Sequence, residues 1–395
     1  MNILYYLSTF PKLQKSYVLN EIYELEGRGH DVAVCALYEP DEEIVHEEYD
    51  ELEIPITYLR RPTVTDATEL LSAKALHPRF IKNAIYPASP QIHVANLFRA
   101  KQCIEFVESL EWEPDHVHAH FALRSRFPAK FVSAYYGTSF TITAHAFDLY
   151  GEPVGAYTSR LLRSCDRIIT ISEYNRRQIR DRFAPETPID VVRAAISLDK
   201  FTPTERSVPN RILTTARFVE KKGLSYALEA VALVAERIPE IEYHVIGHGA
   251  LKSKLVQQTE RLGIGDIVTF LDRVDDRRLI DELDDARVFL LPCVIAASGD
   301  RDGIPVAMME AMAMGTPPVS TTVSGIPELV GHEESGLLTE PRNPRETADA
   351  VTRLLRDDDA HAAYSIRARE TVADGFDIQK QVDRLERSFR AARLG

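Results

Sequence analysis

Short apolar segments alternate with longer helix-like segments on both sides of residues 201–210, a polar stretch that contains proline. Strands that alternate with helices form parallel sheets covered on both faces. A chain of 395 residues is also too long for one ordinary hydrophobic core. We therefore predict an α/β protein with two doubly wound, Rossmann-like domains. In the second half, strands are predicted at residues 211–216, 242–246, 267–271 and 288–292, and helices at residues 224–237, 251–262 and 279–286.

The polar stretch also sets the predicted domain limits. Residues 1–205 form the first predicted domain, and residues 206–376 form the second. The first domain opens with a strand, a loop over residues 8–16, a helix and a second strand, which is the opening unit of a doubly wound domain. Residues 377–395 stand apart as a closing helix, because their apolar side chains recur at helical spacing.

Two acidic residues flank one short helical run in the sequence DGIPVAMME. Asp302 precedes a turn in which Gly303 permits an unusual backbone angle and Pro305 suits the first turn of a helix. The free N–H groups at a helix start attract phosphate or sugar oxygens, and Glu310 is able to bind a vicinal diol such as a ribose. The pattern predicts a sugar-nucleotide site, with a buried structural glutamate as the alternative.

A basic loop precedes this helix in the sequence RILTTARFVEKKG. Arg217 and Lys222 lie five residues apart between a predicted strand and a predicted helix. A guanidinium group and an ammonium group at such a loop suit a diphosphate, whose negative charge must be stabilised as it leaves. An ordinary solvated loop is the alternative reading.

Histidines mark the ends of strands in the first half. His145 follows the predicted strand at residues 140–143 and precedes Asp148 by three positions, so it should face a cleft between the domains. His116, His118 and His120 alternate and share one face of a strand, as metal ligands sometimes do. We predict no metal there, because no acidic residue or cysteine stands at ligand spacing beside them.

Together these segments resemble the family 4 glycosyltransferases, which are retaining, nucleotide-sugar-dependent enzymes with the GT-B fold. Arg217 and Lys222 match the phosphate-binding pair of that family. Its paired acids, seven residues apart, match Asp302 and Glu310, although the first acid of the family is usually Glu. The sequence VIGHG matches its glycine loop, and GIPE at residues 325–328 matches the segment after its next strand.

The resemblance implies a GT-B protein with a cleft between its domains and with the closing helix crossing back to the first domain. It implies a hexosyltransferase that needs no metal or cofactor and uses a nucleotide sugar, UDP- or GDP-linked, as co-substrate. The loop of residues 8–16 resembles members that build exopolysaccharide or other surface glycans. The resemblance assigns catalysis to Arg217, Lys222, Asp302 and His145. It assigns donor binding to Gly247, Gly249, Gly303, Ile304, Pro305 and Glu310. It places on the acceptor side Ser8, Lys12, Ser16, His118, His120 and Asp148.

Two other functions stay open on sequence grounds. A nucleotide-sugar epimerase on the same fold would turn over the donor without an acceptor. A non-catalytic sugar-nucleotide sensor would keep the phosphate and ribose contacts without needing His145. The simultaneous presence of Arg217, Lys222, His145 and both acids favours a transferase over a sensor.

The formal charge of −13 argues against a nucleic-acid partner. Four scattered cysteines indicate a reducing compartment, and no apolar run approaches the roughly twenty residues of a membrane span, so we expect a cytoplasmic protein. Residues 74–102 mix basic and apolar side chains. They are predicted to face a lipid-linked acceptor or the cytoplasmic face of a membrane, with an ordinary surface helix pair as the alternative.

Overall fold

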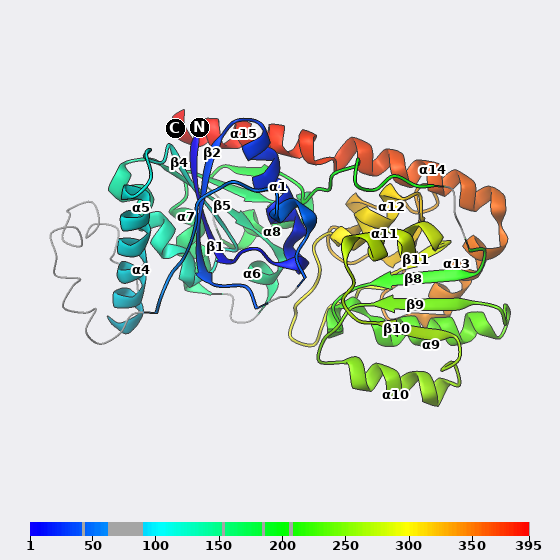
Figure 1. Ribbon diagram of the computed structural model, residues 1–395. Helices are drawn as coiled ribbons and strands as arrows, with labels where there is room; N and C mark the ends of the chain where they lie inside the picture. Colours follow the sequence, from blue (N-terminus) through cyan, green and yellow to red (C-terminus); the bar gives the residue numbers. More distant parts are fainter. Residues whose placement is uncertain (42–43, 62–89, 152–154, 184–185, 205–207, 395) are drawn as a thin grey trace.

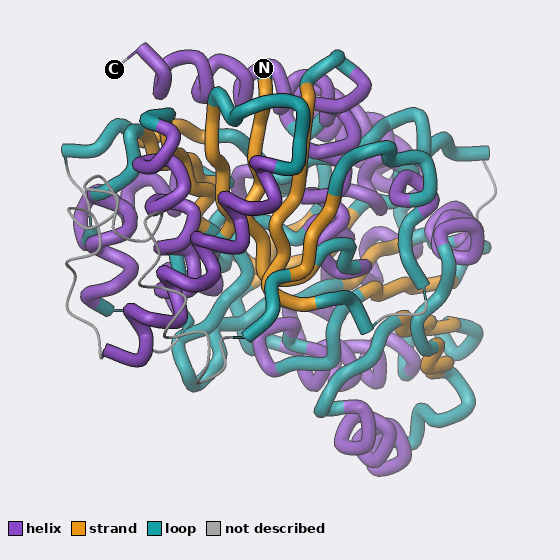
Figure 2. Tube along the Cα trace, turned by 60° about the vertical axis from the view of Figure 1, so that its left-hand side comes forward, coloured by secondary structure: helices purple, strands orange, loops and turns teal. Residues whose placement is uncertain are grey.

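The computed structural model describes residues 1–41, 44–61, 90–151, 155–183, 186–204 and 208–394, which form two parallel sheets side by side (Figure 1). The first sheet has the strand order β3-β2-β1-β4-β5-β6-β7. Helices lie on both of its faces (Figure 2). Its strands are β1 (Asn2–Thr9), β2 (Asp31–Tyr38), β3 (Ile56–Tyr58), β4 (His116–His120), β5 (Ser139–Ala144), β6 (Arg167–Thr170) and β7 (Ile189–Val191).

The second sheet repeats this winding with the order β10-β9-β8-β11-β12-β13. In each sheet the order reverses beside one central strand, β1 in the first and β8 in the second. Ligands of open parallel sheets bind where the order reverses, beyond the carboxyl ends of the strands. The strands are β8 (Arg211–Thr215), β9 (Glu242–Ile246), β10 (Val268–Leu271), β11 (Val288–Leu290), β12 (Pro318–Thr321) and β13 (Leu337–Thr339).

The helices connect successive strands and cover the sheets. In the first half they are α1 (Ser16–Gly27), α4 (Pro90–Glu108), α5 (Phe127–Tyr136), α6 (Ala146–Tyr150), α7 (Ala156–Arg163) and α8 (Glu173–Arg182). In the second half they are α9 (Leu224–Ala235), α10 (Lys252–Leu262), α11 (Asp276–Asp285), α12 (Val306–Ala313), α13 (Pro344–Arg356), α14 (Asp358–Gly375) and α15 (Ile378–Leu394). Short 3-10 turns include η1 (Leu13–Lys15), η2 (Glu47–Tyr49), η4 (Glu220–Lys222) and η5 (Ile326–Glu328).

The predicted strand at residues 242–246 coincides with β9, whereas other boundaries shift for local reasons. Helix α11 begins three residues before its predicted start, at Asp276. The side chain of Asp275 accepts a hydrogen bond from the backbone N–H of Arg278, 2.8 Å away, and so caps the helix. The sequence prediction followed apolar periodicity and missed this polar cap.

Helix α15 runs back along the molecule from the second sheet to the first (Figure 1). Near its end, Arg393 Nη2 donates to Asp115 Oδ1 at 2.9 Å, and the backbone N–H of Asn2 donates to Asp115 Oδ2 at 3.0 Å. Val382, Leu385 and Phe389 pack in the same buried cluster as Ile3 and Ile22. Burial of these side chains stabilises the docking by roughly 1.5–3 kcal/mol each.

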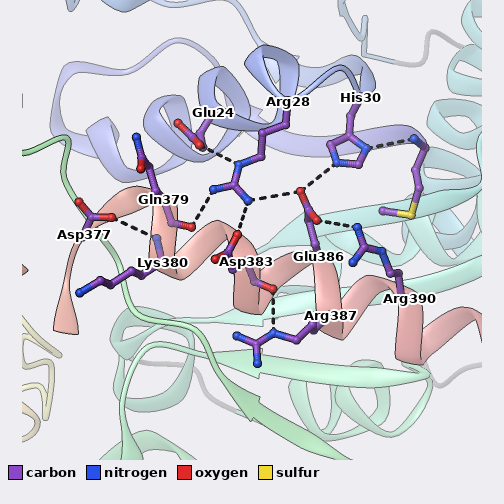
Figure 3. Close-up of polar contacts among 11 residues, drawn as sticks. Glu24, Arg28, His30, Asp377, Gln379, Lys380, Asp383, Glu386, Arg387 and Arg390 are labelled. Carbon is purple, nitrogen blue, oxygen red and sulfur yellow. Dashed lines mark hydrogen bonds and ion pairs between the residues drawn. The ribbon is translucent and has the colours of Figure 1, made fainter. Parts of the chain in front are cut away.

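Polar contacts fix the register of this docked helix against α1 (Figure 3). Arg28 Nη1 donates to Asp383 Oδ1 at 2.5 Å, and Arg28 Nη2 donates to the carbonyl of Gln379 at 2.8 Å. Glu386 Oε1 lies 3.1 Å from His30 Nε2. The closing helix is therefore an integral part of the first half of the fold.

Among the described residues, no helix is both long enough and apolar enough to cross a bilayer. Most of the basic and apolar segment at residues 74–102 lies outside the described residues; only its part within α4 is described. All four cysteines are buried and free.

Candidate active site

A cavity of about 520 Å³ separates the carboxyl ends of the two sheets, and we call it the cleft. Both halves of the chain line it. The first half contributes Ser8, Lys12, Ser16, Tyr17, Phe121 and His145, and the second contributes Arg217, Lys222, Gly247, Asp302, Gly303, Ile304, Pro305 and Glu310. Residues predicted from separate sequence segments therefore converge on one cavity.

The loop after β8 presents its basic groups to the cleft. Arg217 is exposed at the cavity wall, and within the described part of the chain no hydrogen bond or ion pair engages its side chain. Lys222 ends turn η4 and is followed by Gly223, whose φ of 68° lies in the left-handed region. A Cβ at Gly223 would lie 1.8 Å from the carbonyl oxygen of Pro292, so only glycine fits this turn.

Lys222 forms an ion pair with Asp302 across the cleft floor, with Nζ 2.6 Å from Oδ2. Burial alone would lower the pKa of Lys222, but the Asp302 carboxylate raises it above its ordinary value. Burial would likewise raise the pKa of Asp302, yet Lys222 and then Lys221 hold it below its ordinary value. Both groups are therefore charged at neutral pH.

Lys221 is a site residue that the sequence reasoning missed. Its Nζ lies 3.1 Å from Asp300 and 3.6 Å from Asp302 Oδ1, and the residue is only 5% exposed. Two adjacent lysines thus share two carboxylates from the segment that precedes α12. The doubled lysine in EKKG was the available signal, but a sequence does not show which acids lie opposite.

Helix α12 carries Glu310 into the cleft from the second half. Burial raises the pKa of Glu310 to about 7, although the positive charges of His46 and Lys200 oppose this shift. Its carboxyl group therefore titrates near neutrality and is available to accept hydrogen bonds when ionised.

The reason predicted for Gly303 was wrong. Its φ does not fall among the positive values found in this chain, so no unusual backbone angle requires glycine there. A Cβ at this position would instead lie 2.6 Å from Ile171 Cδ1 and 3.7 Å from the Cβ of Ala146. Glycine is favoured because the first half of the chain approaches the start of α12 closely.

His145 stands at the start of α6 and lines the cleft. Its backbone N–H donates to Asp148 Oδ1 at 2.8 Å, and its ring lies 4.4 Å from the ring of Phe121. Burial lowers the pKa of His145 well below its ordinary value, and the nearby His120 and Lys15 lower it further. The imidazole is therefore neutral at neutral pH.

Three predicted acceptor-side residues do not line the cleft. Asp148 is 1% exposed, and its second oxygen accepts from the Ala122 N–H at 2.6 Å, so it caps α6 and orders the neighbouring loop. His118 is fully buried and packs on Phe389 of α15. His120 is 1% exposed, and behind the cleft wall its Nδ1 lies 3.0 Å from His145 Nε2. The two histidines are buried because α15 and α1 cover this face of strand β4.

The two glycines of the predicted glycine loop differ in their positions relative to the cleft. Gly247 lines the cleft, and a Cβ there would lie 1.9 Å from the carbonyl oxygen of Ala216. Gly249 lies beside the cleft rather than along it. A Cβ at Gly249 would lie 2.6 Å from the carbonyl oxygen of Phe218, so this glycine allows the loop after β9 to pack on the loop after β8.

An acidic residue does join the strand histidines, contrary to the sequence reading. Glu21 of α1 brings Oε1 to 3.3 Å from His120 Nε2 and 3.9 Å from His118 Nε2. Tyr5 donates its hydroxyl to the same oxygen at 2.5 Å. The group forms a buried hydrogen-bonded network, and the absence of a metal requirement stays a prediction.

Structural comparison identifies the fold of this protein. The fold is the GT-B fold of two parallel α/β sheets. HepE from Anabaena, solved in complex with UDP and glucose, matches over 99% of this chain and 100% of its own, with a TM-score of 0.74 and 15% identity. Sucrose-phosphate synthase from Thermosynechococcus elongatus matches over 99% and 98%, with a TM-score of 0.73 and 17% identity.

Sequence comparison gives the family. The family model described as "Glycosyl transferase 4-like domain" matches residues 14–195, and the family model described as "Glycosyl transferases group 1" matches residues 197–371. The putative colanic acid biosynthesis glycosyltransferase WcaL of Salmonella typhimurium is 30% identical over 96% of this chain and 97% of its own length. The amylovoran biosynthesis glycosyltransferase AmsK of Erwinia amylovora is 27% identical over 95% and 96%.

The chain belongs to the family 4 glycosyltransferases and is a nucleotide-sugar-dependent glycosyltransferase. This membership weighs against the epimerase and the non-catalytic sensor.

Proposed function

We propose that the enzyme transfers a sugar, with retention of anomeric configuration, from a UDP- or GDP-sugar to a hydroxyl group of a glycan or lipid-linked saccharide. The observation that carries this proposal is the convergence of Arg217, Lys222 and Glu310 on one cavity with His145 opposite them. The UDP in the HepE complex supports a UDP-sugar. The names of WcaL and AmsK support a role in building an exopolysaccharide.

In this proposal the donor lies against the second half of the chain. Arg217 and Lys222 bind the diphosphate, and Glu310 accepts hydrogen bonds from the ribose hydroxyls. Asp302 holds Lys222 in place and, with the backbone N–H groups of Gly303 and Ile304, orients the donor sugar. Because Asp302 is one methylene shorter than the usual Glu and is already paired with Lys222, it contacts the sugar through water.

The acceptor lies against Ser8, Lys12 and Ser16, and the neutral His145 forms the wall between acceptor and donor sugar. The acceptor hydroxyl oxygen forms a bond to the anomeric carbon as the bond from that carbon to the diphosphate breaks. The electron pair leaves with the diphosphate, and the hydroxyl proton passes to the departing phosphate oxygen. Positioning and stabilisation of the leaving charge by Arg217 and Lys222 supply most of the catalysis.

A donor screen tests the proposal. UDP-, GDP-, ADP- and CMP-sugars are offered to the purified enzyme, and binding is followed by thermal shift and slow sugar release. We expect one uridine or guanosine class to stabilise the protein. NMR of the sugar as it is released should initially show the same anomeric configuration as in the donor. That result would demonstrate retention. Inversion would overturn the retaining mechanism, and the lack of any nucleotide binding would overturn the assigned donor contacts.

A further inference from the structure

A polar cluster closes one edge of the cleft, and neither the sequence patterns nor the donor contacts above account for it. His46 precedes turn η2 in the first half of the chain, and Asp276 is the first residue of α11 in the second. Their side chains meet with Nδ1 2.8 Å from Oδ1. Both residues line the cleft, and the contact joins positions 230 residues apart.

The second nitrogen of His46 contacts another segment of the first half of the chain. Nε2 lies 2.9 Å from the carbonyl oxygen of Leu13, which belongs to the loop of residues 8–16. A carbonyl oxygen only accepts hydrogen bonds, and so does an ionised carboxylate. A neutral imidazole has one N–H and satisfies one of these partners, whereas an imidazolium satisfies both. These two contacts therefore favour the doubly protonated form of His46.

The surroundings of His46 support this charge state. Asp276 is 7% exposed and also accepts from Lys200 Nζ at 2.7 Å, and the same ammonium binds Glu48 at 2.7 Å. The facing charged groups are thus Asp276, Glu48 and Glu310 on the acidic side and Lys200 on the basic side. Asp276 and Glu48 together balance Lys200 and the imidazolium, and Glu310 adds negative charge when it ionises, so the cluster tolerates the imidazolium.

We propose that His46 is a protonated clasp that ties the loop of residues 8–16 to helix α11 and holds the cleft in its closed arrangement. Loss of the proton breaks one of the two hydrogen bonds. The acceptor-side loop, which carries Lys12 and Ser16, then separates from the donor half. His46 is a positioning residue in this proposal, and its effect on donor affinity rests on the proposed function.

The pH dependence has a definite sign. Burial would lower the pKa of His46, but the hydrogen bond and charge of Asp276 raise it above its ordinary value. A raised folded pKa means that the clasp is complete below the ordinary histidine pKa and is lost as pH rises through the folded pKa. Nucleotide affinity should therefore fall as pH rises through the folded pKa of His46, which lies above the ordinary histidine value.

The direct test is the titration of His46 by NMR in the full chain labelled at histidine, with the His46 signal assigned from its loss in H46N. We expect the folded wild-type residue to titrate above about 6.5, the ordinary value. In D276N the transition should move to lower pH. A His46 that titrates at or below the ordinary value overturns the clasp, whether or not any nucleotide binds.

The functional test is calorimetric titration of UDP and GDP between pH 6 and pH 9. Wild-type affinity should fall about 3- to 10-fold through the His46 transition, as expected for loss of one charged hydrogen bond. H46N should bind weakly at every pH without this transition, and H46K should keep its affinity at alkaline pH. The control is H30N, which removes another histidine paired to an acid, one that does not line the cleft, and should keep the wild-type profile.

An H46N variant that keeps the wild-type pH profile would overturn the link to affinity. If neither nucleotide binds the wild type, the proposed donor site fails, while the NMR titration still decides the clasp.

Discussion

The loops that follow the two central strands occupy equivalent places in their sheets but differ in what faces their lysines. After β8, Lys222 lies 2.6 Å from the carboxylate of Asp302. After β1, Lys15 donates to Ser8 Oγ at 3.2 Å, and its Nζ lies 4.5 Å above the ring of Phe121. The first arrangement pairs a cation with a carboxylate, whereas the second places a cation beside a hydroxyl group and over an aromatic ring. One winding pattern thus provides two chemically different halves of a single cleft.

The largest expected effect is a difference in enzymatic activity between variants of the two loops. Lys222→Ala should lower kcat/KM by about 10²–10³-fold, because the diphosphate loses a preorganised positive charge as it leaves. Lys15→Ala should lower it by no more than about tenfold and act mainly through the acceptor KM. Initial rates with saturating donor and varied acceptor measure both. Equal losses in the two variants would mean that the loops do not divide the substrates as proposed.

A second prediction concerns Glu310. Because burial raises its pKa to about 7, ionising it in the folded protein costs stability as pH rises from its ordinary value toward 7. Glu310→Gln should therefore raise Tm at pH 8 while weakening nucleotide binding by about tenfold, through loss of charged hydrogen bonds to the ribose. It should also remove the fall in affinity below pH 7. Thermal unfolding and calorimetry at pH 6 and pH 8 check these outcomes, and a lower Tm would contradict them.

The balance of charge beneath the β8 loop is tested by Asp302→Asn. Removing this carboxylate leaves Lys222 without its closest partner, so we expect a loss of about 1–3 kcal/mol in unfolding free energy at pH 7, the cost of an unsatisfied buried polar group. The wild-type contribution should disappear as pH falls below 4, because the folded pKa of Asp302 lies below its ordinary value. Asp300→Asn is the matched control. Asp300 is more exposed than Asp302, with side-chain exposures of 24% and 13%, so its loss should cost less.

The smallest expected effect probes the approach of the two halves. Gly303→Ala places a methyl group against the end of Ile171, a flexible side chain, so we expect a loss of only a few-fold in kcat/KM. Ile171→Ala should restore activity to the double variant by making room for that methyl. A failure of this rescue would mean that the glycine matters for some reason other than close packing.

Periodicity and local motifs predicted much of this molecule. The alternation of strands and helices determines both parallel sheets, and the residues of the basic loop and of α12 do reach one cavity. Contacts between distant segments could not be predicted from local sequence patterns. His46 meets Asp276 across 230 positions, and Glu21 meets His120 across 99, so neither pair leaves a local pattern. His118 was predicted to lie on the acceptor side of the cleft but is fully buried, because covering helices, rather than the strand itself, decide which face is buried.

The most direct test of the division between the loops is nucleotide binding without an acceptor. UDP and GDP are titrated by calorimetry into the wild type, Arg217→Ala and Lys12→Ala at pH 7. We predict that one nucleotide binds the wild type, that Arg217→Ala weakens it by at least about tenfold, and that Lys12→Ala changes it by less than about twofold. Equal weakening in both variants, or no effect of Arg217→Ala, would contradict the assignment of the diphosphate to the loop after β8.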